Sequence, residues 1–119
     1  MTEKRLLIVS GTHGNEINPI WAVEKFKKIN YQDCEDKNIQ FILGNPYACE
    51  KGLRYIDVDL NRSFNVPETS INTKYYEINR AKNLLKNFGI KSSKPCQIAI
   101  DLHTTTSSMG TSIVMYGRR

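Results

Sequence analysis

Arg5-Leu-Leu-Ile-Val-Ser10 runs directly into Gly11-Thr-His-Gly-Asn-Glu16, near the start of a chain of 119 residues. A continuous apolar run that ends in a glycine is typical of a strand buried on both faces of a parallel sheet. The polar segment 11–16 then predicts a loop. Asn18 is a candidate N-cap and Pro19 suits the first position of a helix, so a helix is expected to follow the loop. The beginning of the chain therefore predicts a strand–loop–helix unit.

Two further strands are predicted after this unit. Residues 39–43 are an apolar run closed by Gly44-Asn45-Pro46, and residues 98–100 start another apolar run. Between these strands, apolar residues recur at three- and four-residue steps from Tyr75 to Phe88, which predicts an amphipathic helix that ends at Gly89.

The remaining segments complete the expected organisation. Residues 47–73 show little periodicity and are predicted to be loop, and residues 112–116 are a candidate fourth strand. Strands that alternate with helices indicate α/β architecture with a mainly parallel sheet. We expect one domain over residues 1–119, with ligands bound at the carboxyl ends of its strands.

Composition narrows the classes of function. The chain has 17 Lys and Arg against 12 Asp and Glu, a net charge of +5. The lysines are spread over the predicted helical faces and do not form a stripe, so no nucleic-acid partner is expected. The apolar run Leu6–Val9 is too short for a signal peptide or a membrane span. A protein that is neither exported nor bound to membrane is therefore expected.

The cysteines point to a reducing compartment. Cys34, Cys49 and Cys96 are odd in number and contain no C-x-x-C pair. They are interpreted as reduced thiols in a cytoplasmic protein.

Both histidines of the chain follow predicted strands. His13 and Glu16 lie three residues apart in the loop after the first strand, and His103 follows the third strand. Catalytic zinc sites commonly use two His and one Glu and leave a fourth position for water or substrate. The sequence therefore predicts that His13, Glu16 and His103 bind a metal ion. Asp101, two residues before His103, projects to the same side and could accept a hydrogen bond from a ligand imidazole, although a turn or capping role explains it equally well.

The glycines of the ligand loop do not indicate nucleotide binding. Gly11 and Gly14 are not followed by the Gly-Lys-Ser/Thr end of a phosphate-binding loop, nor by the second half of a dinucleotide fingerprint. They are interpreted as positions that allow tight backbone turns around the ion.

The segment Arg54-Tyr-Ile-Asp-Val-Asp-Leu-Asn-Arg62 combines charged groups with alternating apolar residues. Arginine side chains bind carboxylates in bidentate fashion, so Arg54 and Arg62, with Asn61 as a further donor, are candidates for gripping an acidic substrate. In the alternative interpretation, Asp57 and Asp59 neutralise these arginines in structural ion pairs.

Three motifs, in order, resemble those of the aspartoacylase and succinylglutamate desuccinylase family. They are Gly11-Thr-His-Gly-Asn-Glu16, Asn45-Pro46 with the segment 54–62, and Asp101-Leu-His-Thr-Thr-Thr-Ser-Ser-Met-Gly110. The stretches Asp-Leu-Asn-Arg-Ser-Phe and Thr-Thr-Ser-Ser-Met-Gly are closer to the aspartoacylase branch. The resemblance spans nearly the whole chain.

This resemblance implies a fold similar to the zinc carboxypeptidases. It implies that His13, Glu16 and His103 bind one Zn²⁺ per chain and that Arg54, Asn61 and Arg62 line the substrate site. The implied reaction is hydrolysis of the amide of a small anionic N-acyl amino acid such as N-acetylaspartate, with N-succinylglutamate as the alternative substrate.

The resemblance also implies that the chain is the N-terminal portion of a catalytic domain. The family's general-base glutamate, a further substrate-binding arginine and a C-terminal domain match no position within residues 1–119. An inactive metal-binding fragment is therefore an alternative expectation, and a homo-oligomer is left open.

Overall fold

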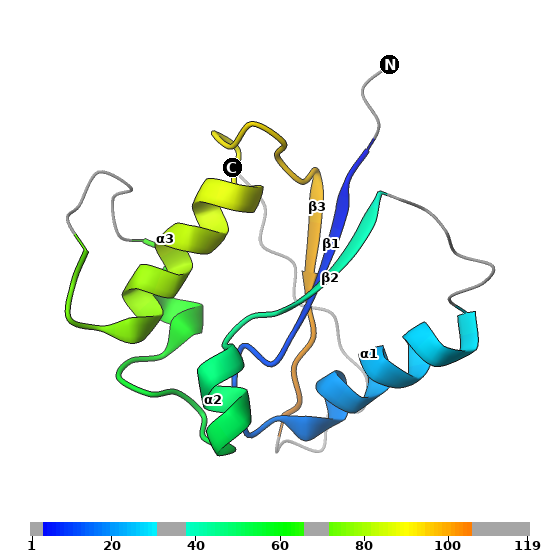
Figure 1. Cartoon of the computed structure of the whole chain (residues 1–119), viewed down its shortest axis with the longest axis horizontal. Coiled ribbons are helices and arrows are strands. Elements are labelled where there is room, and N and C mark those ends of the chain that lie inside the picture. The colour runs from blue at the N-terminus through cyan, green and yellow to red at the C-terminus, as the bar shows by residue number, and fades with distance from the viewer. Residues whose placement is uncertain (1–3, 31–37, 66–71, 106–119) are drawn as a thin grey trace.

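Three parallel strands form the centre of the computed structural model, which describes residues 4–30, 38–65 and 72–105 (Figure 1). The strands are β1 (Leu6–Ser10), β2 (Ile39–Leu43) and β3 (Ile98–Asp101), in the sheet order β2-β1-β3. Leu6 is paired with Ile39 on one side and with Ile98 on the other. Because all three strands run the same way, their carboxyl ends meet at one edge of the sheet.

The two long helices cover opposite faces of this sheet. They are α1 (Ile17–Asn30) and α3 (Tyr76–Phe88), and Figure 1 shows the sheet between them. Phe41 in β2 packs its ring 5.9 Å from that of Phe26 in α1, whereas its neighbour Ile42 packs against the core that α3 helps to form. Successive strand residues point to opposite faces, so these contacts place the helices in two layers.

The architecture confirms the predicted α/β class and the three strands that fall in the described ranges. The first helix begins at Ile17, so Asn18 lies inside it and is not its cap. The predicted strand 112–116 lies outside the described residues.

The prediction of continuous loop over residues 47–73 was wrong. That segment contains most of α2 (Pro46–Lys51) and a 3₁₀ turn, η1 (Leu60–Arg62). The side chain of Asn45 caps α2 by accepting a hydrogen bond from the Ala48 N–H, and Gly52 ends it with φ of 64°. Local capping therefore specifies a helix of six residues, which is too short for periodicity to reveal.

The buried face of α3 contains one charged residue that the hydropathy pattern would place at the surface. The helix ends before Gly89, as predicted, and begins one residue after Tyr75, which is its N-cap. Ala81 and Leu84 pack with Leu60 of η1 in the hydrophobic core, but Glu77 is also fully buried on α3. Burial of a carboxylate requires specific partners, which are described below.

Arg80 joins α3 to the end of β2. Its Nε donates to the Gly44 carbonyl oxygen at 2.8 Å, and its Nη2 donates to the Leu43 carbonyl oxygen at 2.9 Å. The guanidinium therefore satisfies backbone acceptors at the edge where β2 ends.

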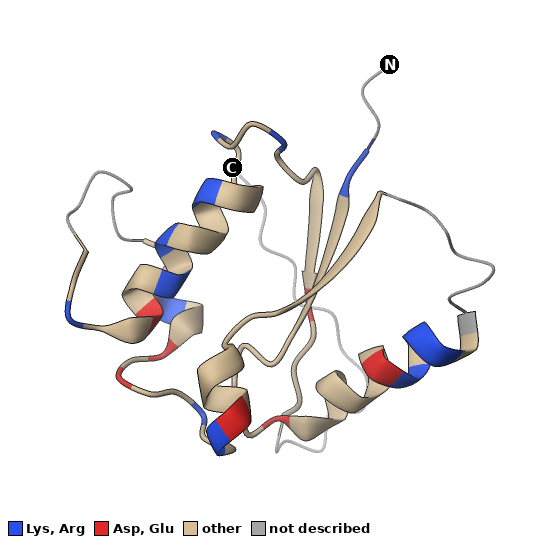
Figure 2. Cartoon of the chain, in the orientation of Figure 1, with Lys and Arg blue, Asp and Glu red and all other residues tan. Residues whose placement is uncertain are grey.

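Basic side chains are dispersed over the molecule. Figure 2 shows Lys and Arg on α1, on α3 and on the segment that leads to β3, interrupted by acidic residues on both long helices. None of the helices in the described ranges has the length and apolar character needed to cross a bilayer. Cys49 and Cys96 are free thiols, and Cys34 lies outside the described residues.

Candidate metal centre

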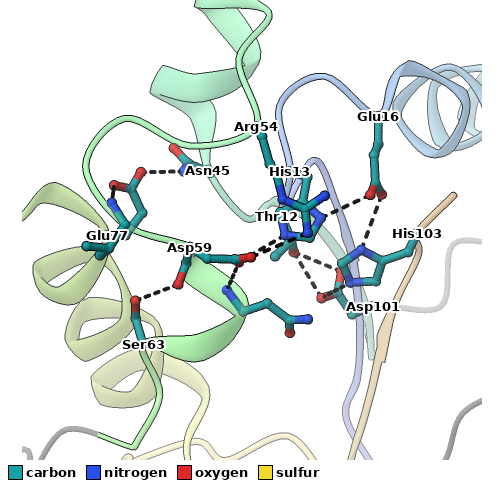
Figure 3. Close-up of polar contacts among 12 residues, drawn as sticks. Thr12, His13, Glu16, Asn45, Arg54, Asp59, Ser63, Glu77, Asp101 and His103 are labelled. Atoms are coloured by element: carbon teal, nitrogen blue, oxygen red, sulfur yellow. Dashed lines mark hydrogen bonds and ion pairs between the residues drawn. The ribbon is translucent and has the colours of Figure 1, made fainter. Parts of the chain in front are cut away.

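His13, Glu16 and His103 meet at the carboxyl edge of the sheet. His13 and Glu16 lie in the loop after β1, and His103 lies two residues beyond the end of β3 (Figure 3). The Leu102 N–H donates to the Val9 carbonyl oxygen at 2.9 Å, so pairing with β1 continues up to the residue before His103. One potential ligand atom from each of the three residues lies within 4.8 Å of the others. The structure thus brings together the three residues that the sequence singled out.

Glu16 lies between the two imidazoles. Its Oε1 is 3.0 Å from Nδ1 of His13, and its Oε2 is 3.2 Å from Nδ1 of His103. The two rings are edge to face with centroids 5.1 Å apart. The backbone N–H of Thr104 donates to Glu16 Oε2 at 3.0 Å. Both imidazoles therefore present the same nitrogen, Nδ1, to one carboxylate.

A second carboxylate lies behind each imidazole. Nε2 of His13 is 2.9 Å from Oδ1 of Asp59, and Nε2 of His103 is 2.9 Å from Oδ2 of Asp101. A carboxylate that accepts the Nε2 proton fixes the tautomer in which Nδ1 carries a free lone pair. This role is one of the two interpretations that the sequence left open for Asp101, whereas the sequence suggested Asp59 only as a partner for the arginines.

These outer carboxylates are themselves held in place. Thr12 donates its hydroxyl to both oxygens of Asp101, at 2.9 and 3.0 Å. Asp59 accepts the N–H of Asn61 at 2.9 Å and lies 3.4 Å from Nη2 of Arg54. Both orienting groups are thus fixed by at least two contacts.

The carboxyl groups of the centre favour the ionised form. Burial raises the pKa of Glu16, but the Thr104 N–H and the two imidazoles outweigh it and hold that pKa below its usual value. Burial likewise raises the pKa of Asp59, and hydrogen bonds from His13 and the Asn61 N–H, with the Arg54 charge, bring it below its usual value. Ionised carboxylates are the form that binds cations.

The pKa of the His103 imidazole is affected by the neighbouring carboxylates. Its hydrogen bond with Asp101 raises its pKa, burial opposes this, and the charges of Asp101 and Glu16 add to the rise, so the pKa lies above its usual value. In the absence of a cation, these carboxylates favour a proton on the ring.

Close packing fixes the ligand loop. Gly11 has φ of +67°, a conformation that L side chains rarely adopt. A Cβ atom on Gly14 would lie 2.1 Å from the carbonyl carbon of Ala48, so the loop rests directly on α2. The interpretation of these glycines as residues required by the local backbone is consistent with this geometry.

The donor set fits a tetrahedral cation such as zinc. Two ligands bound at about 2.0–2.1 Å with tetrahedral angles are roughly 3.4 Å apart. The observed separations of Glu16 oxygens from the imidazole nitrogens are 3.0 and 3.2 Å. The site offers two imidazole nitrogens and one carboxylate, and a further carboxylate lies behind each imidazole. This set of donors is compatible with the ligands that catalytic zinc centres commonly use.

The predicted substrate-binding residues lie next to this centre on one segment. The side chains of Arg54, Asn61 and Arg62 are exposed, and the last two belong to η1. Arg54 forms an ion pair with Asp59, as the structural alternative proposed. The guanidinium of Arg62 has no ion pair or hydrogen bond within the described ranges. Asp57 accepts the Tyr76 N–H at 2.8 Å and thus joins the segment to α3.

Comparison with known proteins places the chain in a family. Residues 2–119 match the family model of the succinylglutamate desuccinylase/aspartoacylase catalytic domain. The chain is 61% identical to a probable aspartoacylase of Prochlorococcus marinus strain AS9601 and 48% identical to one of strain SARG. Each match covers all of this chain but only 40% and 39% of the relative, so the chain spans about two fifths of these proteins.

Solved structures show the same fold. The crystal structure of murine aminoacylase 3 superposes with a TM-score of 0.65 at 28% identity, over 87% of this chain and 36% of that one. The succinylglutamate desuccinylase of Vibrio parahaemolyticus gives a TM-score of 0.63 at 24% identity, over 86% and 36%. With the matched motifs and the shared zinc-carboxypeptidase-like fold, the chain belongs to the succinylglutamate desuccinylase/aspartoacylase family.

Proposed function

We propose that residues 1–119 are the N-terminal portion of the catalytic domain of a zinc-dependent deacylase. The observation that carries this proposal is the group of His13, Glu16 and His103, whose ligand atoms converge within 4.8 Å. In this proposal the domain hydrolyses the amide bond of an N-acyl amino acid. With N-acetylaspartate as the substrate, the products are acetate and aspartate. The names of the relatives, probable aspartoacylases, support this substrate.

The proposed roles follow from the positions of the side chains. Nδ1 of His13, Nδ1 of His103 and the Glu16 carboxylate would hold the ion, and Asp59 and Asp101 would keep both imidazoles in the required tautomer. Zinc would supply Lewis-acid polarisation of the amide carbonyl and activation of water at neutral pH.

Arg54, Asn61 and Arg62 would bind the substrate carboxylate beside this centre. Arg62 suits the role because its exposed guanidinium is not engaged by any described side chain. A bidentate contact would fix the amide relative to the ion, and orientation of this kind lowers the barrier of the reaction.

The general base is not assigned to any described glutamate. Glu16 is a proposed ligand, and Glu77 is fully buried with both oxygens occupied. Glu24 and Glu50 lie on exposed faces of α1 and α2. We propose that the base is supplied by a residue outside the described ranges, as the greater length of the relatives allows.

N-succinylglutamate is the alternative substrate, because succinylglutamate desuccinylases belong to the same family. Both substrates present a carboxylate near an amide, so the arginines of this chain fit either one. Relative turnover of the two compounds by the complete catalytic domain would distinguish them.

Metal binding tests the proposal directly. The purified chain should bind about one zinc ion through its three ligands, and removal of any one ligand should abolish most of the zinc binding. His13→Ala, His103→Ala and Glu16→Gln should therefore lose zinc in an equilibrium dialysis with elemental analysis. Glu50→Gln makes the same chemical change as Glu16→Gln at an exposed position and should retain zinc. Full occupancy in all three ligand variants would refute the proposed centre.

A further inference from the structure

Glu77 is a buried carboxylate outside the proposed metal centre. It lies in the first turn of α3 and is 0% exposed. A buried charge is costly unless every polar atom has a partner. The N-terminus of a helix favours an anion, but this effect alone does not explain complete burial.

Four donors surround the two oxygens of Glu77. Oε1 accepts the N–H of Asp57 at 2.7 Å and that of Val58 at 3.1 Å. Oε2 accepts the N–H of Ile56 at 3.0 Å and the side-chain amide of Asn45 at 2.7 Å. Three consecutive backbone N–H groups therefore converge on one side chain, an arrangement that only an ionised carboxylate satisfies fully.

These three residues immediately precede Asp59, which contacts His13. We call residues 54–62 the clamp segment, because they also contain the proposed substrate-binding residues Arg54, Asn61 and Arg62. The segment is attached to α3 twice, since Asp57 also accepts the Tyr76 N–H. The segment contains no strand and only the three-residue turn η1, so its backbone position depends on tertiary contacts, which are these hydrogen bonds and the packing of Leu60 against α3.

We propose that Glu77 is a positioning residue that fixes the clamp segment, so that Asp59 meets Nε2 of His13 and the substrate-binding side chains lie beside the metal centre. The proposal deepens the proposed function and rests on it, because the roles of Asp59 and the clamp segment are those assigned above. Glu77 itself touches neither ligand nor substrate in this account. It acts through the backbone of Ile56, Asp57 and Val58.

A purely structural role makes a different prediction. If Glu77 only stabilises α3, its replacement lowers the melting temperature but leaves the folded site unchanged. If it positions the clamp segment, the environment of His13 changes in protein that is still folded. Measurements well below the melting temperature separate these two cases.

Glu77→Gln is the informative variant. Glutamine has the same size, but its NH₂ group would face backbone or amide donors and could not accept their hydrogen bonds. Glu50→Gln on the exposed surface of α2 is the matched control. Both variants are compared with the unaltered 119-residue chain by circular dichroism to confirm folding.

The first measurement needs no metal. The ¹⁵N NMR shifts of the His13 ring report the hydrogen bond between Nε2 and Asp59, and amide exchange reports the N–H groups of residues 56–58. In Glu77→Gln we expect the Nε2 shift to move and amide exchange within residues 56–58 to accelerate about tenfold or more. Glu50→Gln should match the unaltered chain.

The second measurement is zinc affinity by competition with a chelator. Loss of a group that orients a ligand typically weakens metal binding about 10- to 100-fold, and Glu77→Gln should weaken zinc binding toward that range through the displaced Asp59. A double-mutant cycle with Asp59→Asn tests the route. If Glu77 acts through Asp59, the double variant should bind zinc about as well as Asp59→Asn alone.

The outcomes separate the two proposals. An unaltered chain that takes up no zinc refutes the proposed function, and the NMR measurement then decides the role of Glu77. A folded Glu77→Gln variant with unchanged His13 shifts and unchanged zinc affinity overturns the positioning role. If that variant does not fold, Asn45→Ser takes its place, because serine can still cap α2 but removes one donor from Glu77.

Discussion

Nε2 of His13 lies 2.9 Å from Oδ1 of Asp59, a residue 46 positions later in the chain. His103 has the equivalent contact with Asp101, only two residues away. The candidate centre therefore has two similar halves of different origin. The half at His103 is local in sequence, whereas the half at His13 depends on how the segment that follows α2 is folded against α3.

Asp59→Asn should weaken zinc binding by about 10- to 100-fold, because a neutral amide is a poorer acceptor for the His13 Nε2 proton. The measurement is chelator competition at neutral pH. Asp101→Asn should have an effect of the same order at His103. Zinc affinity that is unaffected by either change would show that the outer carboxylates do not assist the centre.

Arg62→Lys should weaken the binding of N-acetylaspartate several-fold, because an ammonium group cannot reproduce the paired hydrogen bonds of a guanidinium. Isothermal titration of the zinc-loaded protein measures the dissociation constant. The melting temperature should barely change, since Arg62 is exposed.

Arg80→Lys is the contrasting variant for Arg62. Arg80 donates to the Gly44 and Leu43 carbonyl oxygens, so this change should lower the melting temperature and leave ligand affinity unchanged. The reverse pattern, with Arg62 needed for stability and not for ligand binding, would favour the structural interpretation of the clamp segment.

Glu77 should make the unfolding free energy of the chain depend on pH in the acidic range. Burial raises its pKa, but the N–H groups of Asp57, Ile56 and Val58 and the Asn45 amide outweigh it, so its folded pKa lies below the usual glutamate value of 4.5. A carboxyl whose pKa is lowered by folding contributes stability above its unfolded pKa and loses it as pH falls through the folded pKa.

Urea unfolding of the unaltered chain and of Glu77→Gln between pH 7 and pH 3 measures this contribution. The difference in unfolding free energy should be largest at pH 7 and should shrink as pH falls below about 4.5, the unfolded value. Glu50→Gln corrects for the change of one unit in the net charge of the chain. A difference that stays constant over this range would contradict the assignment of an ionised Glu77.

Gly14→Ala should destabilise the fold by about 1–3 kcal/mol and reduce zinc affinity, because its Cβ would lie 2.1 Å from Ala48 backbone. Gly52→Ala is the control, since Gly52 has φ of +64° but open space around it. It should cost about 1–2 kcal/mol through backbone strain alone and should leave zinc binding intact. Equal zinc affinity in both variants would show that the contact of Gly14 with Ala48 does not affect the metal centre.

Residues 1–119 alone should bind zinc but show little deacylase activity. None of the described glutamates is positioned as a general base, and loss of a base removes about two to four orders of magnitude in rate. The assay uses N-acetylaspartate, N-acetylated aromatic amino acids and N-succinylglutamate. Ordinary enzymatic turnover that His103→Ala abolishes would contradict this expectation and place a base within these residues.

Local patterns in the sequence were sufficient for the strands, for α3 and for the three candidate ligands. Apolar runs that end in glycine or in polar residues mark parallel strands, although β3 is exposed along its length, and His13 and His103 closely follow two of these strands. Because parallel strands share a carboxyl edge, the convergence of these ligands follows from order along the chain alone. Asp101 could be placed for the same reason, since strand geometry fixes the side of a residue two positions away.

Only the tertiary structure revealed the contacts of Asp59 and Glu77. Hydropathy treats both as surface residues, and the contacts that bury or orient them come from residues far away in the sequence. The capping sequence Asn45-Pro46 could have revealed α2, but nothing local shows that Asn45 also donates to Glu77. Periodicity reports which face of an element is apolar, whereas the burial of a carboxylate depends on donors that folding brings to it. The sequence therefore identified the candidate metal ligands, and the packing of the clamp segment against α3 places Asp59 against His13.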